Sequence, residues 1–170
     1  QTSRELTFQS WPPVLSIPFR RFGRTGIQMP IWSLGGMRFQ QSWKELTPDE
    51  ITPENQQQLE RTLLRATDCG LRHVETARHY GRSELQLGFA FKRLPDSHRL
   101  IQTKVPPRQD PQEFEYELEL SFQRLGWQKL DLLAIHGLNL PSHLEQTIRA
   151  GGCLDVVRRW QEQGRVKHVG

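Results

Sequence analysis

Short apolar segments and longer amphipathic segments alternate along most of the chain. Largely apolar stretches occur at 71–76 (LRHVET), 99–105 (RLIQTKV), 129–136 (KLDLLAIH) and 165–170 (RVKHVG). Between them, apolar residues recur every three or four positions, which is the period of a helix with one buried face. The apolar stretches recur about every 30 residues, the length of one strand–helix unit, so the pattern predicts alternating strands and helices.

Local signals mark the ends of these elements. The predicted helices run over 53–70, 83–95 and 111–126, and a fourth, with Cys153 among its apolar residues, ends at Gly164. Ser83 and Gln86 predict a capping box at the start of the second helix. Before the first helix, two short extended pieces flank residues 23–26, which predicts a hairpin leading into a buried strand near 31–34.

Nearly continuous apolar strands separated by helices favour a parallel sheet covered on both faces. A doubly wound sheet and a (β/α)8 barrel both fit that description. The dinucleotide-binding form of the open sheet needs G-x-G-x-x-G after its first strand, and SLGGMRF at 33–39 does not supply it.

The ionisable residues at the strand ends favour the barrel. Glu75, Lys104 and His136 each lie at or near the carboxyl end of a predicted strand. In a barrel these ends converge on one mouth, where active sites are built. We therefore expect the three side chains to share one site.

Composition and charge exclude several other classes of protein. The net charge is +4, from 23 basic and 19 acidic residues that are interspersed, so we expect no nucleic-acid partner. The apolar runs are shorter than the ~20 residues of a membrane helix, and residues 1–15 do not resemble a secretory signal. With two cysteines and no CxxC pair, a reducing compartment, the cytoplasm, is expected. Residues 1–18 are expected to form a flexible arm before a domain over 19–170.

The stretch HVETARHYG at 73–81 permits a metal site or an acid–base site. His73 and Glu75 share one face of a strand and could bind one ion, as in a metal-dependent hydrolase, but no further ligand is evident. In the acid–base alternative, Lys104 lowers the pKa of the Tyr80 phenol and pairs with Glu75. His136 would orient a substrate oxygen, as needed when hydride reaches a carbonyl carbon.

The stretches GLRHVETARHYGRSELQLG, LIQTKV, LDLLAIHG and GRVKHVG together resemble the aldo/keto reductase superfamily over about residues 18–170. The resemblance implies a (β/α)8 barrel that binds NADP(H) or NAD(H) without a Rossmann motif and reduces aldehydes or ketones. It implies that Tyr80 is the proton donor, which Lys104 tunes. It also implies that His136 orients the carbonyl and that Glu75 occupies the position of the usual aspartate.

The resemblance extends to the cofactor contacts. Gly36 and Met37, with Gly35 before them, follow the first barrel strand, where family members contact the cofactor through backbone atoms; a glycine turn at the rim is the structural alternative. Glu75 is longer than aspartate by one methylene, so less room is left for the cofactor. A nucleotide-binding sensor or scaffold without turnover therefore remains an alternative to the enzyme.

Several phrases, among them RRFGRTGIQMP and ETARHYGRSE, resemble a branch whose barrel precedes a ferredoxin-like tail expected to hold a 4Fe–4S cluster. That tail is not in these 170 residues, so no cluster is assigned to them. We expect the first four βα units and the start of the fifth strand. Because such a half-barrel has open edges, we expect it to be unstable alone, to pair with another copy, or to be a fragment of a longer chain.

The other polar candidates are interpreted as structural. Asp131 is expected to be a hydrogen-bonding group within a strand, and Phe39 and Trp43 are candidates for lining a substrate pocket. His79 is expected to point away from Tyr80 or to cap the loop, and the remaining histidines are expected in or beside loops and facing solvent: His98, His143 and His168.

Overall fold

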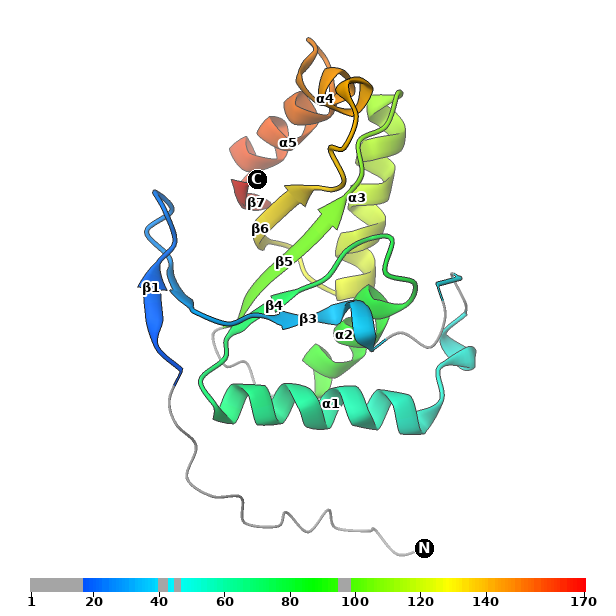
Figure 1. Cartoon of the computed structure of the whole chain (residues 1–170). Coiled ribbons are helices and arrows are strands. Elements are labelled where there is room, and N and C mark those ends of the chain that lie inside the picture. Colours follow the sequence, from blue (N-terminus) through cyan, green and yellow to red (C-terminus); the bar gives the residue numbers. More distant parts are fainter. Residues whose placement is uncertain (1–16, 40–42, 45–46, 95–98) are drawn as a thin grey trace, which may run out of the picture.

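A computed structural model describes residues 17–39, 43–44, 47–94 and 99–170 of the chain. Its main sheet contains five parallel strands in chain order (Figure 1). These strands are β3 (Leu34–Gly35), β4 (His73–Glu75), β5 (Leu100–Val105), β6 (Leu130–Ile135) and β7 (Val166–Val169). The strand order never reverses, as it would in a doubly wound sheet, and it matches the first part of a (β/α)8 barrel. The barrel prediction is confirmed.

Helices follow each of the first four strands, so four βα units and a fifth strand are described. They are α1 (Pro53–Asp68), α2 (Ser83–Arg93), α3 (Pro111–Leu125), α4 (Pro141–Ile148) and α5 (Cys153–Glu162), together with the short 3₁₀ helices η1 (Gly36–Arg38) and η2 (Pro48–Glu50). The pattern did not predict α4, because this short helix keeps most of its large apolar side chains exposed, among them Leu144 and Ile148.

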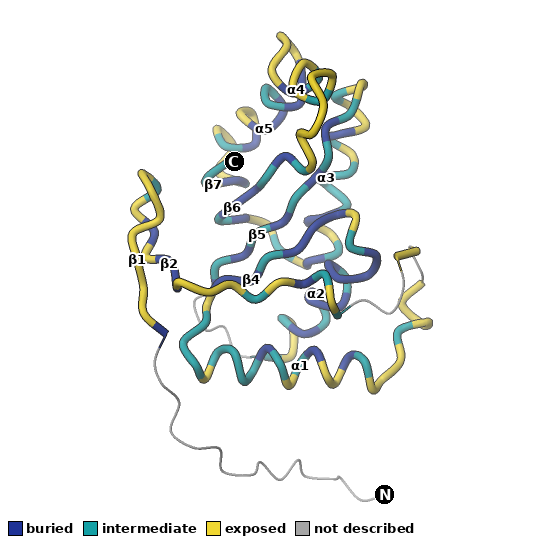
Figure 2. The backbone as a smooth tube through the Cα atoms, viewed as in Figure 1, coloured by how far each residue is buried: buried dark blue, intermediate teal, exposed yellow. Residues whose placement is uncertain are grey.

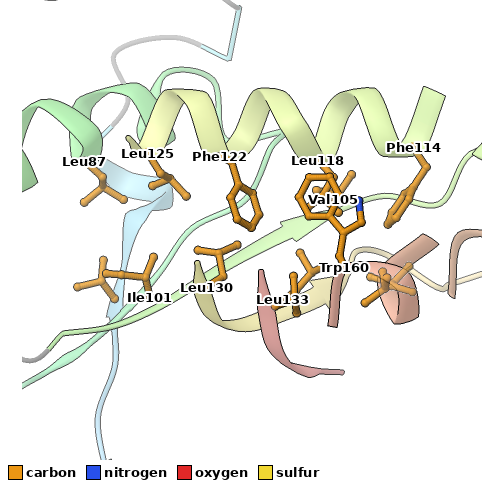
Figure 3. Close-up of a cluster of buried hydrophobic side chains, with 14 of the residues drawn as sticks. Leu87, Ile101, Val105, Phe114, Leu118, Phe122, Leu125, Leu130, Leu133 and Trp160 are labelled. Atoms are coloured by element: carbon orange, nitrogen blue, oxygen red, sulfur yellow. The ribbon is translucent and has the colours of Figure 1, made fainter. Parts of the chain in front are cut away.

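The main hydrophobic core lies between the sheet and its helices. Figure 3 shows the apolar side chains of α3 pointing toward those of β5 and β6. Phe114, Leu118, Phe122 and Leu125 are all at most 2% exposed. Burying one such side chain fully is worth about 1.5–3 kcal/mol relative to leaving it exposed. This row therefore holds α3 firmly behind the strands that carry Lys104 and His136.

The predicted starts of α1, α2 and α3 agree with the structure, but the capping box predicted for α2 is wrong. The side chains of Thr52 and Asp110 accept hydrogen bonds from the backbone N–H groups of Asn55 and Gln112, at 3.3 and 2.8 Å. Ser83 makes no such cap, because Arg82 precedes α2 as its N-cap and the Ser83 hydroxyl is fully buried, where it donates to the carbonyl of Gly36.

Helices α2 and α3 approach each other closely at Gly88. A Cβ atom added at this residue would lie 2.0 Å from the backbone oxygen of Arg124. Any larger residue would therefore push the two helices apart. Because α2 begins directly after the loop that carries Tyr80, this contact also sets the position of that loop.

The predicted N-terminal hairpin is confirmed by β1 (Phe19–Arg21) and β2 (Gln28–Pro30), which pair antiparallel. Ile27 and Met29 pack on Leu132 and so cover the amino end of the sheet. The strand expected near 31–34 is shorter and less buried than predicted, since Ile31 is 43% exposed and β3 lies at an edge of the sheet.

Burial follows this layout, with the strands β4 to β6 largely covered and the hairpin and α4 largely exposed (Figure 2). Residues 1–16 of the expected arm and Pro95 lie outside the described residues. Ile17 is buried and donates its N–H to the carbonyl of Cys69, which ties the start of the described chain to the end of α1. No helix in the described part of the chain is long and apolar enough to cross a bilayer.

Candidate active site

Lys104 is the centre of a polar cluster at the carboxyl ends of the strands. Its Nζ donates to the carboxylate of Glu75 on β4, to the Tyr80 hydroxyl at 3.1 Å and to the Thr76 carbonyl at 3.2 Å. The side chains of Lys104 and Glu75 are 16% and 28% exposed. Their ion pair is thus partly shielded while one side of it still reaches solvent. The sequence prediction that these groups share one site agrees with this geometry.

Tyr80 lies in the loop between β4 and α2. Its backbone N–H donates to the Ala77 carbonyl at 3.0 Å, which shapes the turn. The ammonium of Lys104 also lies 4.6 Å from the centre of the Tyr80 ring. A cation at this distance from an aromatic face is attracted to the ring, so Lys104 contacts both the hydroxyl and the ring of Tyr80.

His136 follows β6 and faces Tyr80. The two rings meet edge to face, with centroids 5.7 Å apart and planes at 88°. Burial, followed by the charges of Lys104 and His79, holds the pKa of His136 below its ordinary value of 6.5. The imidazole is therefore neutral at pH 7, with one ring N–H available as a hydrogen-bond donor.

Gly36 and Met37 lie in η1, directly after β3 and next to the end of β4. A Cβ atom at Gly36 would lie 2.5 Å from the Ser83 hydroxyl, so glycine is required here for packing. Gly35 pairs with Glu75 across the sheet, and a Cβ atom at Gly35 would meet nothing within 4 Å. The rim beside Glu75 thus presents bare backbone to open space.

His73 lies two residues before Glu75 and is 5% exposed. Its Nδ1 forms a 2.6 Å hydrogen bond with the Ser33 hydroxyl, and burial lowers the pKa of this histidine. Over residues 17–39, 43–44, 47–94 and 99–170, no three His, Cys, Asp or Glu side chains are grouped closely enough to hold a metal ion. His73 thus has a structural hydrogen-bonding partner, the Ser33 hydroxyl.

The other histidines occupy varied places. His79 is exposed, with its Nε2 3.4 Å from Arg108, and His143 contacts the Gly137 carbonyl at 2.9 Å. His168 is half-buried within β7, so its assignment to a solvent-facing loop is wrong. The reason is that β7 continues through this polar position. His98 lies outside the described residues.

The three remaining candidates are placed as follows. Asp131 accepts from the backbone N–H of Ile101 at 3.4 Å, in line with its structural interpretation. Phe39 packs against the main core, and Trp43 is 65% exposed. Phe39 was expected to line a substrate pocket, and its contact with the core gives it a structural role.

The pattern missed several buried polar residues beneath the cluster. Thr76 and Ser83 are fully buried and hydrogen-bonded to each other at 2.8 Å. The Glu84 carboxylate accepts from Thr103, next to Lys104, at 2.6 Å, and burial raises the pKa of Glu84. Of these residues only Ser83 had a predicted role, in a capping box with Gln86, and the packing shows that its side chain points into the protein instead.

Comparison with known proteins identifies the family. Residues 33–170 match the model of the aldo/keto reductase family. The chain is 26% identical over 130 residues to the NADH-specific methylglyoxal reductase of Escherichia coli strain K12, covering 64% of this chain and 39% of that protein.

Solved structures show the same fold. A structure from Pseudomonas aeruginosa assigned to the aldo-keto reductases superposes with a TM-score of 0.76 at 24% identity, over 96% of this chain and 63% of that one. An aldo-keto reductase from Klebsiella pneumoniae in complex with NADPH gives 0.66 at 21% identity, over 92% and 49%. The chain thus spans less than two thirds of the length of these relatives. From the family match and the fold, the chain belongs to the aldo/keto reductase family.

Proposed function

We propose that the protein is an NAD(P)H-dependent oxidoreductase that reduces an aldehyde or a ketone, with Tyr80 as the proton donor. One observation carries the proposal: the ammonium of Lys104 contacts both the Tyr80 hydroxyl and the Glu75 carboxylate at the carboxyl ends of neighbouring strands. In this position the Lys104 ammonium can stabilise the negative charge that develops on the Tyr80 oxygen as its proton is transferred.

Each residue has a distinct task in this reaction. A substrate carbonyl oxygen between Tyr80 and His136 accepts a hydrogen bond from the neutral imidazole, which orients it. As negative charge develops on that oxygen, the Tyr80 hydroxyl passes its proton to it. Lys104 stays protonated and donates to the resulting phenolate, while Glu75 and the Thr76 carbonyl hold the ammonium in place.

The residues of the rim fit a nicotinamide nucleotide. Gly35 leaves bare backbone beside Glu75, and the partly exposed Glu75–Lys104 pair offers a carboxylate to a polar group of the cofactor. When bound, the nucleotide supplies the hydride. Glu75 reaches Lys104 despite being longer than aspartate, so the pair survives this departure from the family. NADH and NADPH both need testing, since the Escherichia coli relative is NADH-specific and the Klebsiella pneumoniae structure holds NADPH.

The test uses the complete protein with NADH or NADPH and a panel of aldehydes and ketones that includes methylglyoxal, the substrate named for the Escherichia coli relative. We expect oxidation of one nucleotide that depends on the carbonyl substrate. Tyr80→Phe should lower kcat by about 10²–10⁴-fold, the range of a lost general acid. The matched control is Tyr116→Phe, since Tyr116 on α3 is 66% exposed and should leave kcat unchanged.

Equal rates for wild type and Tyr80→Phe would contradict the assigned role. The sensor alternative, which the substitution of glutamate for aspartate at position 75 favours, predicts nucleotide binding with no turnover of any carbonyl in the panel. Calorimetric titration of the nucleotide alongside the rate assay separates these two functions.

A further inference from the structure

A chain of buried hydrogen bonds links the rim after β3 to the Lys104 ammonium. The Ser83 hydroxyl donates to the Gly36 carbonyl at 2.8 Å, and the Thr76 hydroxyl donates to the Ser83 oxygen at 2.8 Å. The Thr76 carbonyl in turn accepts from Lys104 Nζ at 3.2 Å. Ser83 therefore connects the loop after β4, through Thr76, to Gly36, which lies 47 residues away in the sequence.

Ser83 is also connected to the loop of the proton donor. Its backbone N–H donates to the carbonyl of Tyr80 at 3.0 Å, so Ser83 closes the turn that carries the phenol. Both atoms of the Ser83 hydroxyl and its amide are engaged. Because Ser83 and Thr76 are 0% exposed, water cannot replace these partners when one is removed.

We propose that Ser83 is a positioning residue that fixes the distance between the rim at Gly36 and the Lys104–Tyr80 pair. The inference deepens the proposed function and rests on it. In that function the nucleotide binds at the rim near Gly36, and the transferred proton comes from Tyr80 beside Lys104. Ser83 would set the distance between these two places. Small errors in such a separation are costly, since hydride and proton must reach neighbouring atoms of one carbonyl.

Close packing makes this spacing rigid. A Cβ atom at Gly36 would lie 2.5 Å from the Ser83 oxygen and 3.1 Å from the Thr76 hydroxyl. The Gly36 backbone therefore rests directly on the two hydroxyl groups, and neither can turn away without opening a gap. A hydroxyl in the middle of this stack acts as a spacer as well as a hydrogen-bonding group.

Removing the Ser83 hydroxyl and removing the Thr76 hydroxyl should cause different kinetic defects. Ser83→Ala removes the link to Gly36 and to Thr76, so we expect the nucleotide Kd to rise about tenfold and kcat to fall about tenfold. Thr76→Val removes only the hydrogen bond from Thr76 to Ser83 and keeps both the backbone carbonyl that Lys104 contacts and the Ser83–Gly36 bond, so kcat should fall about tenfold while Kd stays within about threefold of wild type. Thr76→Ser keeps the hydroxyl and should restore both values.

Thr147→Val is the matched control, because Thr147 on α4 is a 4% exposed hydroxyl that donates to the His143 carbonyl at 2.8 Å. It should lower the melting temperature while leaving Kd and kcat unchanged well below that temperature. Nucleotide Kd is measured by calorimetry and kcat by substrate-dependent nucleotide oxidation, both on the complete protein.

Thr76→Val carries the test if Ser83→Ala folds poorly, and a double-mutant cycle gives a further test where Ser83→Ala folds. Gly36→Ala pushes on the Ser83 oxygen, so its effect on nucleotide Kd should be at least threefold smaller, by order of magnitude, in the Ser83→Ala background. Full additivity of the two changes would overturn the inference, and so would wild-type Kd and kcat for Ser83→Ala in an active protein whose Tyr80→Phe variant is impaired. If the wild type shows neither binding nor turnover, the proposed function fails first and the inference fails with it.

Discussion

The ammonium of Lys104 donates to the Tyr80 hydroxyl at 3.1 Å and, on its other side, to the carboxylate of Glu75. One cation thus stabilises a phenol while an anion fixes the cation. In the proposed proton transfer both contacts matter, because the carboxylate and the Thr76 carbonyl keep the ammonium beside the phenol. The pair and the phenol form a unit that can be tested one member at a time.

Removal of the ammonium is the first test of that unit. Lys104→Met keeps the apolar stem of the side chain but leaves the Tyr80 hydroxyl without its cation. We expect kcat to fall by about 10²–10³-fold with a smaller change in KM, since general acid catalysis contributes in this range. Lys129→Met, at an exposed position, is the control. Unchanged kcat in Lys104→Met would show that the phenol needs no cation.

Substitutions at Glu75 test whether the charge of this side chain matters more than its length. Glu75→Asp keeps the charge and restores the usual family residue, so we expect kcat within about threefold of wild type, by order of magnitude. Glu75→Gln removes the charge that holds Lys104 and should lower kcat by at least about tenfold. Steady-state kinetics on the two variants provide the measurement. Equal losses in both would mean that side-chain length, not charge, decides the position of Lys104.

His73 predicts a specific pH dependence of stability. Burial holds the pKa of folded His73 below its ordinary value of 6.5, so the unfolded chain binds a proton more readily than the folded one. The free energy of unfolding is therefore greatest above that pH and falls as the pH drops through the folded pKa. His73→Gln should flatten the decline in stability between about pH 7 and pH 5. The measurement is urea unfolding of wild type and His73→Gln across this pH range. If the prediction is wrong, the free energy of unfolding will fall equally with pH in both proteins.

The N-cap of α3 gives a prediction for stability alone. The Asp110 carboxylate accepts from the Gln112 N–H at 2.8 Å and lies at the positive end of the helix. Asp110→Ala should lower the free energy of unfolding by about 1 kcal/mol, while Asp110→Asn should keep most of it. Denaturant midpoints of the three proteins check this. A variant with alanine as stable as wild type would show that the interior contacts of α3 alone define its start.

The sequence was sufficient to predict the elements that depend on local signals. The order of strands and helices follows from periodicity, and the starts of α1 and α3 follow from Thr52 and Asp110, whose partners lie two or three residues away. The convergence of Glu75, Lys104 and His136 could also be predicted, because parallel strands place their carboxyl ends together.

Features that depend on distant partners could not be predicted in this way. Ser83 has the local pattern of a cap, but its hydroxyl bonds a carbonyl 47 residues away, and the pattern does not encode that meeting. His168 lies inside the stretch predicted as a strand, but a polar side chain near the end of a short strand does not show from sequence whether it faces solvent or is half-buried. In α4 most large apolar residues remain exposed, so the usual sign of a buried helical face is missing.

The connectivity of the polar cluster has a consequence for how the chain folds. Lys104 is separated from Glu75 by 29 residues and from Tyr80 by 24, so each contact closes one loop no longer than a single βα unit. The entropy lost on closing such a loop grows only with the logarithm of its length, so loops of this size are inexpensive to close. Pairing of β4 with β5 is enough to bring phenol, ammonium and carboxylate together. The side chains proposed to handle the proton can thus be brought together by two adjacent strands, without contacts between more distant parts of the barrel.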